Sequence, residues 1–238
     1  MEHISKSQIK LVRSLQVKKF RDELGLFVAE GRKCVEELSK AFELYLLINS
    51  ENATEREIEQ MSSLKTPQGV IGVFKKRKEE NDSVLSIDLT KELVLVLDGV
   101  QDPGNLGTII RTADWFGISH IICSLDTADC YNSKVVQATM GSLSRVEVHY
   151  TSLPDFIEQQ QTQPIYGTLL DGKDIYKTPL TSHGIIIMGN EGNGISEQVR
   201  KLITSPLFIP AYREGEHAES LNVGIATALT LAEFKRRT

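Results

Sequence analysis

The stretch LDGVQDPGNLGTIIRTADWFGI, residues 97–118, places acidic residues, glycines, a proline and a single arginine between apolar flanks. It follows the run LVLVL (93–97), which is typical of a strand buried on both faces of a parallel sheet. Pro103-Gly104-Asn105 then interrupts the run, and further on apolar residues recur at helical spacing. The stretch therefore predicts a strand, a loop and a helix. In open α/β sheets, ligands bind at such junctions, where the strand has its carboxyl end.

The rest of the C-terminal part continues this alternation. Strands separated by helices favour a parallel sheet with helices on both faces, and about six strands are too few for an eight-stranded barrel. We therefore predict a doubly wound α/β domain. The expected strands are 93–97, 119–123, 145–149, 164–169, 184–188 and 206–209. The expected helices lie near 105–117, 132–143, 153–161, 195–203 and 220–236.

The N-terminal part reads as a smaller α/β unit. Strands are expected at 25–31, 42–48 and 69–75, with helices before and between them. The charged segment 75–83 has no large apolar residue, which is typical of a linker. We predict three parts, listed by residue number: 1–78, a linker at 79–92, and 93–238.

Composition limits the class of protein. A hydrophobic fraction of 40% and a net charge of −5 are ordinary for a soluble globular protein. No apolar run approaches the roughly 20 residues that span a bilayer, and the N-terminus lacks the apolar core of a signal peptide. Three scattered cysteines, Cys34, Cys123 and Cys130, predict neither a disulfide framework nor a zinc site. We expect a cytoplasmic protein that binds no membrane.

The net negative charge argues against a surface that coats nucleic acid everywhere. Residues 6–40, however, carry more basic than acidic side chains. This face is compatible with contacts to a few RNA phosphates, and equally with an ordinary solvated helix face.

A second glycine-rich loop, GNEGNG (189–194), follows the β-branched strand near 184–188. Such a turn lets the backbone approach a ligand closely and presents helix N-terminal amides. The loop lacks the lysine of a phosphate-binding P-loop, and its glycine order differs from the dinucleotide pattern GxGxxG. Glu191 would also repel a phosphate, so a neutral or cationic ligand fits better. The alternative is a tight turn with a structural role only.

The third stretch is LFIPAYREGEHAESLNVGIATALTLAEFKRR, residues 207–237. A strand ends near Ile209-Pro210, and Ser220 is a candidate cap for a helix with a partly apolar face. Ser220 and Asn222, taken alone, are as compatible with helix capping as with chemistry.

Together, DGVQDPGNLGTIIRTADWFG, IIMGNEGNGIS and IP…ESLNVGIATAL resemble, in order and spacing, the three motifs of the SpoU/TrmH family of RNA ribose 2'-O-methyltransferases, within the SPOUT superfamily. The resemblance covers residues 93–237. It implies a trefoil knot in the C-terminal domain, S-adenosylmethionine bound in the knot loops, and a homodimer. FVAEGRKCVEEL (27–38) resembles the RNA substrate-binding domain of family members that act on ribosomal RNA, a domain similar to a small ribosomal protein.

The resemblance implies specific site residues. As the catalytic set it gives Arg111, Asn105, Glu191, Ser220 and Asn222. As the cofactor-binding set it gives Thr168, Leu169, Gly189, Asn190, Gly192, Ile209, Pro210, Leu221 and Asn222. For RNA contact we expect Arg13, Lys18, Lys19, Arg32, Lys33 and Arg111, and we expect no metal ion.

Methyl transfer to a ribose 2'-hydroxyl requires that hydroxyl to lose its proton. An arginine is a poor base, because an unperturbed guanidinium titrates above about 12. We expect Arg111 to hold an RNA phosphate and to stabilise the developing alkoxide, since its planar fork of donors can reach both.

One segment departs from the family pattern. The family usually has Ile-Pro-Met and then a short turn, whereas this chain has IPAYREGEHAESLN (209–222). Ala211 replaces the methionine and the loop is about three residues longer than the family pattern. The difference predicts an altered rim of the cofactor pocket.

Other classes remain as alternatives. An RNA-binding module without catalysis would lack Asn105 or Arg111, and both are present. A dinucleotide-dependent oxidoreductase would need an early GxGxxG, which is not visible. The serious alternative is a tRNA ribose methyltransferase. The extra N-terminal domain favours ribosomal RNA, most simply 23S, by analogy only.

Overall fold

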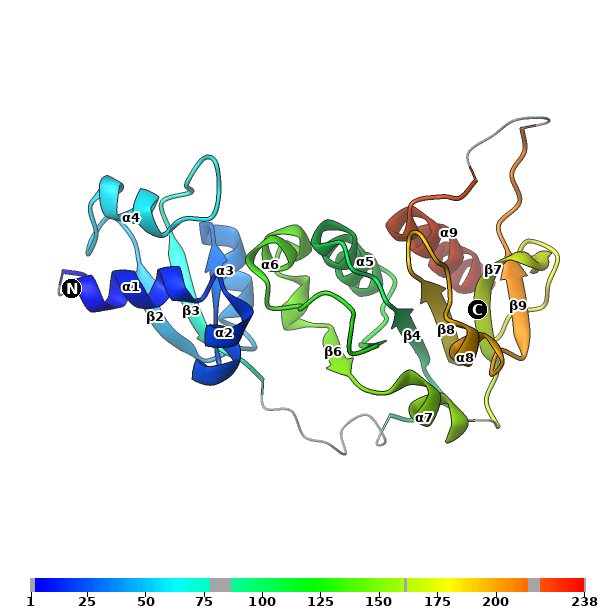
Figure 1. Ribbon diagram of the computed structural model, residues 1–238. Coiled ribbons are helices and arrows are strands. Elements are labelled where there is room, and N and C mark those ends of the chain that lie inside the picture. The colour runs from blue at the N-terminus through cyan, green and yellow to red at the C-terminus, as the bar shows by residue number, and fades with distance from the viewer. Residues whose placement is uncertain (1–2, 78–86, 161, 214–218, 238) are drawn as a thin grey trace. The chain divides into compact units, whose positions relative to one another are not determined.

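The computed structural model describes residues 3–77, 87–160, 162–213 and 219–237. The chain forms two compact units (Figure 1). The first comprises residues 1–78 together with 129–145, and the second comprises 79–128 together with 146–238. None of the helices described is long and apolar enough to cross a lipid bilayer.

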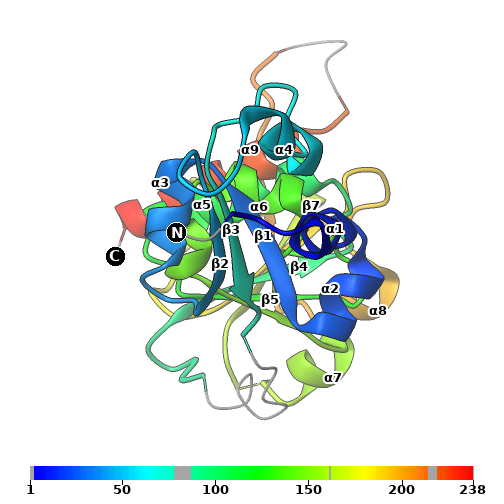
Figure 2. The same ribbon diagram turned by 90° about the vertical axis from the view of Figure 1, so that its left-hand side faces the viewer.

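The first unit is built on a three-stranded antiparallel sheet in the order β1-β3-β2 (Figure 2). Its strands are β1 (Leu26–Glu30), β2 (Leu44–Ile48) and β3 (Ile71–Lys75). Its N-terminal helices are α1 (Lys6–Ser14), α2 (Lys18–Leu24), α3 (Arg32–Leu38) and α4 (Glu55–Met61). α1 and α4 each begin with a capping box, formed by Ser5 with Gln8 and by Thr54 with Glu57.

Helix α2 was not expected from the sequence. No side chain caps its start, and a glycine in the left-handed region, Gly25 at φ +64°, ends it directly before β1. Its one buried residue is the charged Arg21, whereas the apolar Phe20 and Leu24 are 39% and 48% exposed, so the buried face of α2 is not its apolar face.

The segment Asp129–Arg145 completes the first unit. It contains α6 (Ser133–Thr139) and a short 3₁₀ helix, η2 (Ser142–Ser144). The buried guanidinium of Arg21 donates to one carboxylate oxygen of Asp129, at 3.0 Å from Nε and 2.7 Å from Nη2, and also donates to the carbonyl of Leu15 at 2.9 Å. A side chain at Gly141 would lie 2.5 Å from Cβ of Glu37. These contacts fix the segment against the N-terminal residues.

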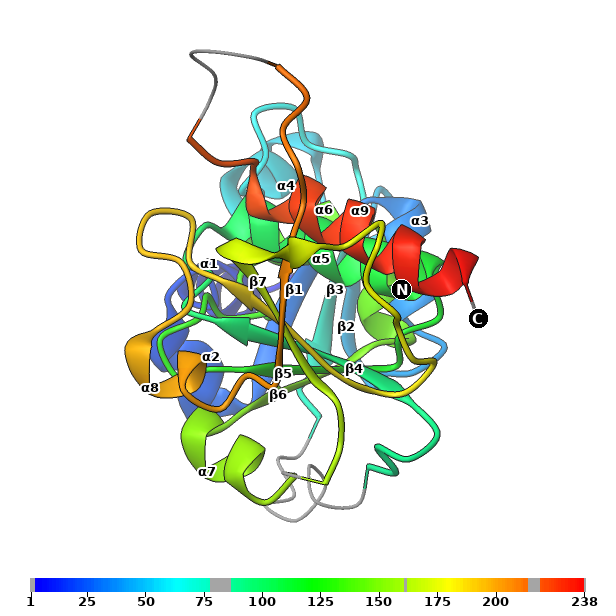
Figure 3. The ribbon, with the colours of Figure 1, turned by 90° about the vertical axis from the view of Figure 1, so that its right-hand side faces the viewer.

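The second unit contains a six-stranded parallel sheet in the order β6-β5-β4-β8-β7-β9 (Figure 3). The strands are β4 (Leu93–Asp98), β5 (His120–Cys123), β6 (Glu147–Tyr150), β7 (Ile165–Asp174), β8 (Gly184–Gly189) and β9 (Ser205–Phe208). Every residue of the central β4 is buried, which explains its continuous apolar sequence.

Helices cover both faces of this sheet (Figure 3). They are α5 (Pro103–Trp115), α7 (Leu153–Glu158), α8 (Glu197–Arg200) and α9 (Val223–Arg236). α7 and α8 pack on one face, where Phe156 and Val199 join a core with Val96 and Ile187. α5 and α9 lie on the other face, packed so closely that a side chain at Gly224 would meet Thr108 at 3.3 Å. The predicted α/β class is thus confirmed, with a parallel six-stranded sheet.

Several boundaries differ from the expectation. The helix expected at 132–143 stops at Met140, which adopts a left-handed φ of +51°. The last helix starts at Val223 rather than near Ser220, because Asn222 is its cap. The domain boundaries 1–78, 79–92 and 93–238 stay a prediction, and residues 78–86 of the linker lie outside the described residues. The knot also stays a prediction, since strand order alone does not define threading.

Candidate active site

The site lies where the direction of strand order reverses. From β4 the chain proceeds to β5 and β6 on one side, and the later strands β8, β7 and β9 lie on the other. Loops that follow β4 and β8 therefore leave the carboxyl edge of the sheet at its topological switch point, where open α/β sheets bind ligands. The three sequence motifs meet at this edge.

The loop after β4 is held by two carboxylates. Oδ2 of Asp98, the last residue of β4, accepts a hydrogen bond of 2.7 Å from the backbone amide of Ser196. Oδ1 of Asp102 accepts one of 2.8 Å from the amide of Asn105 and caps α5, whose first residue is Pro103. The expected helix at 105–117 thus begins two residues earlier, as a proline at the first position permits.

A hydrogen-bonded chain joins all three motifs. Nδ2 of Asn105 donates to Oε1 of Glu191 at 2.8 Å, and Nδ2 of Asn222 donates to Oδ1 of Asn105 at 2.9 Å. Oδ1 of Asn222 in turn accepts from the amides of Gly224 and Ile225, at 3.0 and 3.3 Å. Both ends of the Asn105 amide are therefore fixed. We call Glu191, Asn105 and Asn222 the amide relay.

The glycine-rich loop after β8 is braced by Asn190. Its Nδ2 donates to the carbonyl of Gly99 at 2.6 Å, and its Oδ1 accepts from the amides of Gly192 and Asn193 at 2.8 and 3.0 Å. A side chain at Gly189 would lie 2.3 Å from the carbonyl carbon of Gly194, so only glycine fits there. This backbone cradle carries the exposed carboxylate of Glu191 at its tip.

The remaining predicted cofactor residues lie at neighbouring strand ends. Oγ1 of Thr168 donates to the carbonyl of Ile187 at 3.3 Å. The side chain of Leu169 is partly buried and packs against the core beside α7 and α8. Ile209 and Pro210 follow β9 and are half-buried, whereas 49% of Leu221 is exposed. Much of the lengthened loop, residues 214–218, lies outside the described residues.

Arg111 and Ser220 are not joined to the amide relay. Both are exposed, and neither side chain hydrogen-bonds with another described residue. Arg111 lies about one and two-thirds turns beyond Asn105 on α5, so the two side chains leave the helix in different directions. Ser220 precedes the cap of α9 and does not serve as that cap.

Apart from Arg111, the basic residues expected to contact RNA lie in the first unit, and they are exposed. Arg13 is on α1, Lys18 and Lys19 are on α2, and Arg32 and Lys33 begin α3. Lys19 lies 3.8 Å from Glu23 in an exposed ion pair, which contributes little to stability. Their role in RNA contact stays a prediction.

Sequence reasoning missed the contribution of Ser196 to the site. Its backbone amide, not its side chain, ties the start of α8 to Asp98. No residue type signals such a contact, because every non-proline residue offers the same donor.

Comparisons with known proteins agree with this geometry. Residues 92–232 match the model of the SpoU rRNA methylase family, and residues 6–72 match an MRM3-like substrate binding domain. The family model covers more than half of the chain, so the chain belongs to the SpoU rRNA methylase family. The predicted family and enzyme class, an RNA methyltransferase, are confirmed at this level.

Individual relatives are similar over nearly their whole length. The chain is 29% identical to the 23S rRNA (guanosine(2553)-2'-O)-methyltransferase RlmP of Bacillus subtilis, over 99% of this chain and 98% of that protein. A TrmH-family structure from Porphyromonas gingivalis is 37% identical with a TM-score of 0.88, covering 99% of both chains. An AdoMet-bound rRNA methyltransferase structure from Sinorhizobium meliloti is 31% identical with a TM-score of 0.89, covering 100% of this chain and 98% of that one.

Proposed function

We propose that this protein transfers a methyl group from S-adenosylmethionine to a ribose 2'-hydroxyl of ribosomal RNA. The observation that carries the proposal is the amide relay at the switch point of a SpoU-family sheet. The RNA is 23S ribosomal RNA, as in the name of the B. subtilis relative, which aligns over nearly the full length of the chain.

The donor set of the site fits this cofactor. The loop 189–194 brings backbone close to a ligand at Gly189 and has a carboxylate, Glu191, where a phosphate-binding loop would have a lysine. A carboxylate attracts a cationic sulfonium and repels a phosphate, so the loop suits the sulfonium better. Gly189, Asn190, Gly192 and the strand-end residues listed above would hold the cofactor mainly through backbone atoms.

Bound S-adenosylmethionine supplies an electrophilic methyl group. The residues of this chain orient the nucleophile and its proton. Asn105, fixed at both ends of its amide, keeps Glu191 and Asn222 in one arrangement before substrate arrives, and such preorganisation lowers the barrier. Arg111, exposed and free of described partners, holds a phosphate of the RNA and stabilises the forming 2'-alkoxide. Ser220, equally exposed, would contact the ribose.

The first unit recognises the RNA. Exposed arginines and lysines on α1, α2 and α3 form phosphate contacts, and this unit contains the residues matched by the substrate-binding model. A cytoplasmic location suits a protein that modifies ribosomal RNA, and we place this protein there.

The active form is a homodimer. Leu221, just before α9, is 49% exposed, Ile225 and Leu229 on α9 are 55% and 39% exposed, and Trp115 at the end of α5 is 84% exposed. Phe234, expected on the same face, is instead buried in the core. Exposed apolar side chains on two packed helices suit a second copy related by two-fold symmetry. Analytical ultracentrifugation should show twice 26.6 kDa at micromolar concentration, and a monomer would exclude this interface.

Two experiments test the activity. Calorimetry with purified protein should show S-adenosylmethionine binding, and radiolabelled methyl groups should pass to protein-free ribosomal RNA from a deletion strain but not to RNA already modified by this protein. Mapping of 2'-O-methyl positions in total RNA then names the nucleotide. A site in tRNA that is lost on deletion would replace the ribosomal assignment, and no cofactor binding at millimolar concentration would overturn the enzyme itself.

A further inference from the structure

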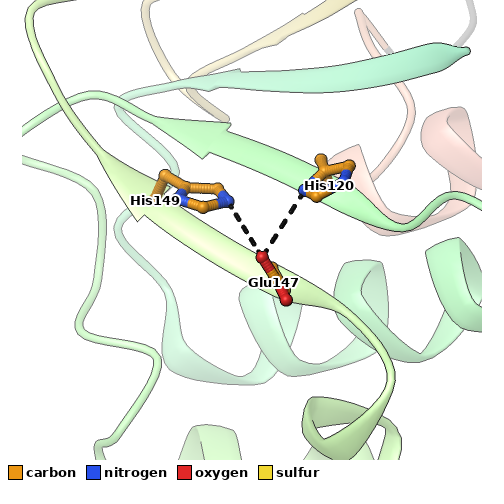
Figure 4. A group of neighbouring side chains, drawn as sticks. All are labelled: His120, Glu147 and His149. Atoms are coloured by element: carbon orange, nitrogen blue, oxygen red, sulfur yellow. Dashed lines mark ion pairs between the residues drawn. The ribbon is translucent and has the colours of Figure 1, made fainter. Parts of the chain in front are cut away.

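A second group of side chains gathers at the opposite edge of the six-stranded sheet. His120 is the first residue of β5, and Glu147 and His149 lie on β6. In the parallel register His120 pairs with Glu147, and Glu147 and His149 are two positions apart on one face of their strand. Figure 4 shows both imidazole rings directed toward the Glu147 carboxylate.

The distances in this cluster exceed those of hydrogen bonds. Oε2 of Glu147 lies 3.8 Å from Nδ1 of His120 and 3.7 Å from Nε2 of His149. The ligand atoms of all three residues lie within 4.8 Å of one another. Two ligands bound tetrahedrally to Zn²⁺ at 2.0–2.1 Å are about 3.4 Å apart. The glutamate–histidine spacings thus need only a few tenths of an ångström of closure around an ion.

One ring nitrogen of His120 faces the cluster, and the other faces a second carboxylate outside it. Its Nδ1 is buried and forms no hydrogen bond within the part of the chain that the structure describes. Its other ring nitrogen, Nε2, faces Oε2 of Glu92 at 3.9 Å. Ligating histidines usually direct their second nitrogen at a carboxylate, which fixes the tautomer and the ring orientation. A carboxylate at each nitrogen is the arrangement that such a ligand requires.

The two histidines of the cluster are more buried than its glutamate, which suits an ion bound at the surface. The side chains of His149 and His120 are 13% and 22% exposed, whereas Glu147 is 48% exposed. The imidazoles are therefore held by packing, while the carboxylate and a fourth position remain open to water. Two histidines with one carboxylate and an open position form a ligand set that zinc enzymes use.

We propose that His120, Glu147 and His149 bind one divalent transition-metal ion, Zn²⁺ above all, with water as the fourth ligand and Glu92 as the outer carboxylate. His120 and Glu147 begin β5 and β6, and Glu92 directly precedes β4, whereas the amide relay lies at the carboxyl edge of the same sheet. The ion therefore fastens the edge strand β6 to its neighbour β5 and takes no part in methyl transfer. This inference departs from the sequence-based expectation of no metal.

The proposal is tested with untagged, full-length protein that has been stripped with a chelator. Dialysis against micromolar Zn²⁺, followed by inductively coupled plasma mass spectrometry, should find one ion per chain, and the ion should raise the melting temperature. Co²⁺ in place of Zn²⁺ should show the intense visible absorption of a four-coordinate ion. Glu147→Gln, at an exposed position where folding tolerates it, should weaken binding of either metal at least about tenfold.

His149→Gln should weaken binding in the same way. His3→Gln is the matched control, because His3 also lies near a glutamate, Glu57 at 3.3 Å, but in a pair without a second histidine. That variant should bind the metal as wild type does, and Glu147→Gln should keep the wild-type methylation rate. Circular dichroism verifies that each variant is folded. A wild-type chain that retains no ion, or a folded Glu147→Gln protein with unchanged affinity, overturns the proposal.

Discussion

The polar side chains at the two edges of the parallel sheet are spaced differently. At the carboxyl edge, Glu191, Asn105 and Asn222 are joined by hydrogen bonds of 2.8 and 2.9 Å. At the amino edge, His120 and His149 stand 3.8 and 3.7 Å from Glu147. At the carboxyl edge these three side chains bond directly to one another, whereas at the amino edge the distances from the imidazoles to the carboxylate leave room for an ion.

The difference shows how one sheet can hold two kinds of site. A substrate site gains from groups that are oriented before the substrate arrives, because reorganisation then costs nothing at the moment of reaction. A metal site gains from ligands that already stand near the separation they have around a bound ion, about 3.4 Å for tetrahedral Zn²⁺. Side chains within hydrogen-bond distance of one another therefore indicate a preorganised substrate site. Ligand-type side chains slightly farther apart indicate a metal site.

The largest effect is expected at Arg111, the residue of the carboxyl edge that the relay leaves free. Arg111→Lys keeps the positive charge but loses the planar fork, so RNA affinity should fall modestly while the chemical step slows about 100-fold or more. Arg111→Ala should be slower still. Single-turnover methylation rates between pH 7 and 10.5 measure both variants.

The pH profile distinguishes two roles for this arginine. A lysine with an ordinary pKa near 10 becomes a neutral base as pH rises. If Arg111 acts by geometry and charge, alkaline pH does not restore the lysine variant. A lysine variant whose rate climbs toward wild type would show that the residue serves as the base.

An intermediate effect is expected from the glycine-rich loop. Gly189→Ala would place a methyl group 2.3 Å from the backbone of Gly194, so it should cost about 1–3 kcal/mol of stability and lower cofactor affinity about tenfold or more. Gly192→Ala is the matched control, since its methyl group would meet only Oδ1 of Asn190 at an ordinary 3.5 Å. Chemical denaturation and calorimetry compare the two. Equal losses would show that the cradle at Gly189 is not specific.

The smallest effect is expected at Asn222, which both caps α9 and orients Asn105. Asn222→Ala should cost about 1 kcal/mol of stability through the lost cap. Asn132→Ala removes the cap of α6, where Asn132 accepts from the amide of Lys134 at 2.9 Å, and should cost a similar amount. Only the Asn222 variant should also slow methylation. If both variants methylate RNA at the wild-type rate, the amide relay has no catalytic role.

Much of the second unit was predictable because its strands are buried on both faces. The run 93–97 and the strand 184–188 lie in the middle of the sheet, and continuous apolar sequence is the signal of that position. Helix α2 was missed for the opposite reason, since its buried residue is an arginine that pairs with a distant aspartate. Local pattern cannot report a partner 108 positions away.

The residues of the site were predictable from the sequence, but the hydrogen bonds between them were not. The three motifs supplied Asn105, Glu191 and Asn222, but the hydrogen bonds among them depend on strand order, which a single sequence does not contain. The metal cluster was missed for the same reason. His120 and Glu147 lie on neighbouring strands and Glu92 directly precedes a third, and nothing in their sequence spacing indicates that register pairs His120 with Glu147.

The first unit consists of two separate stretches of sequence, and this affects the order in which the protein folds during synthesis. Synthesis proceeds from the N-terminus, and domains generally fold as units while it continues. Arg21 leaves the ribosome 108 residues before Asp129, and the N-terminal sheet waits for α6 until strands β4 and β5 have also been made. The first unit therefore cannot finish folding first. Its last contacts form after the first strands of the six-stranded sheet have been synthesised, so the folding of the two units overlaps in time.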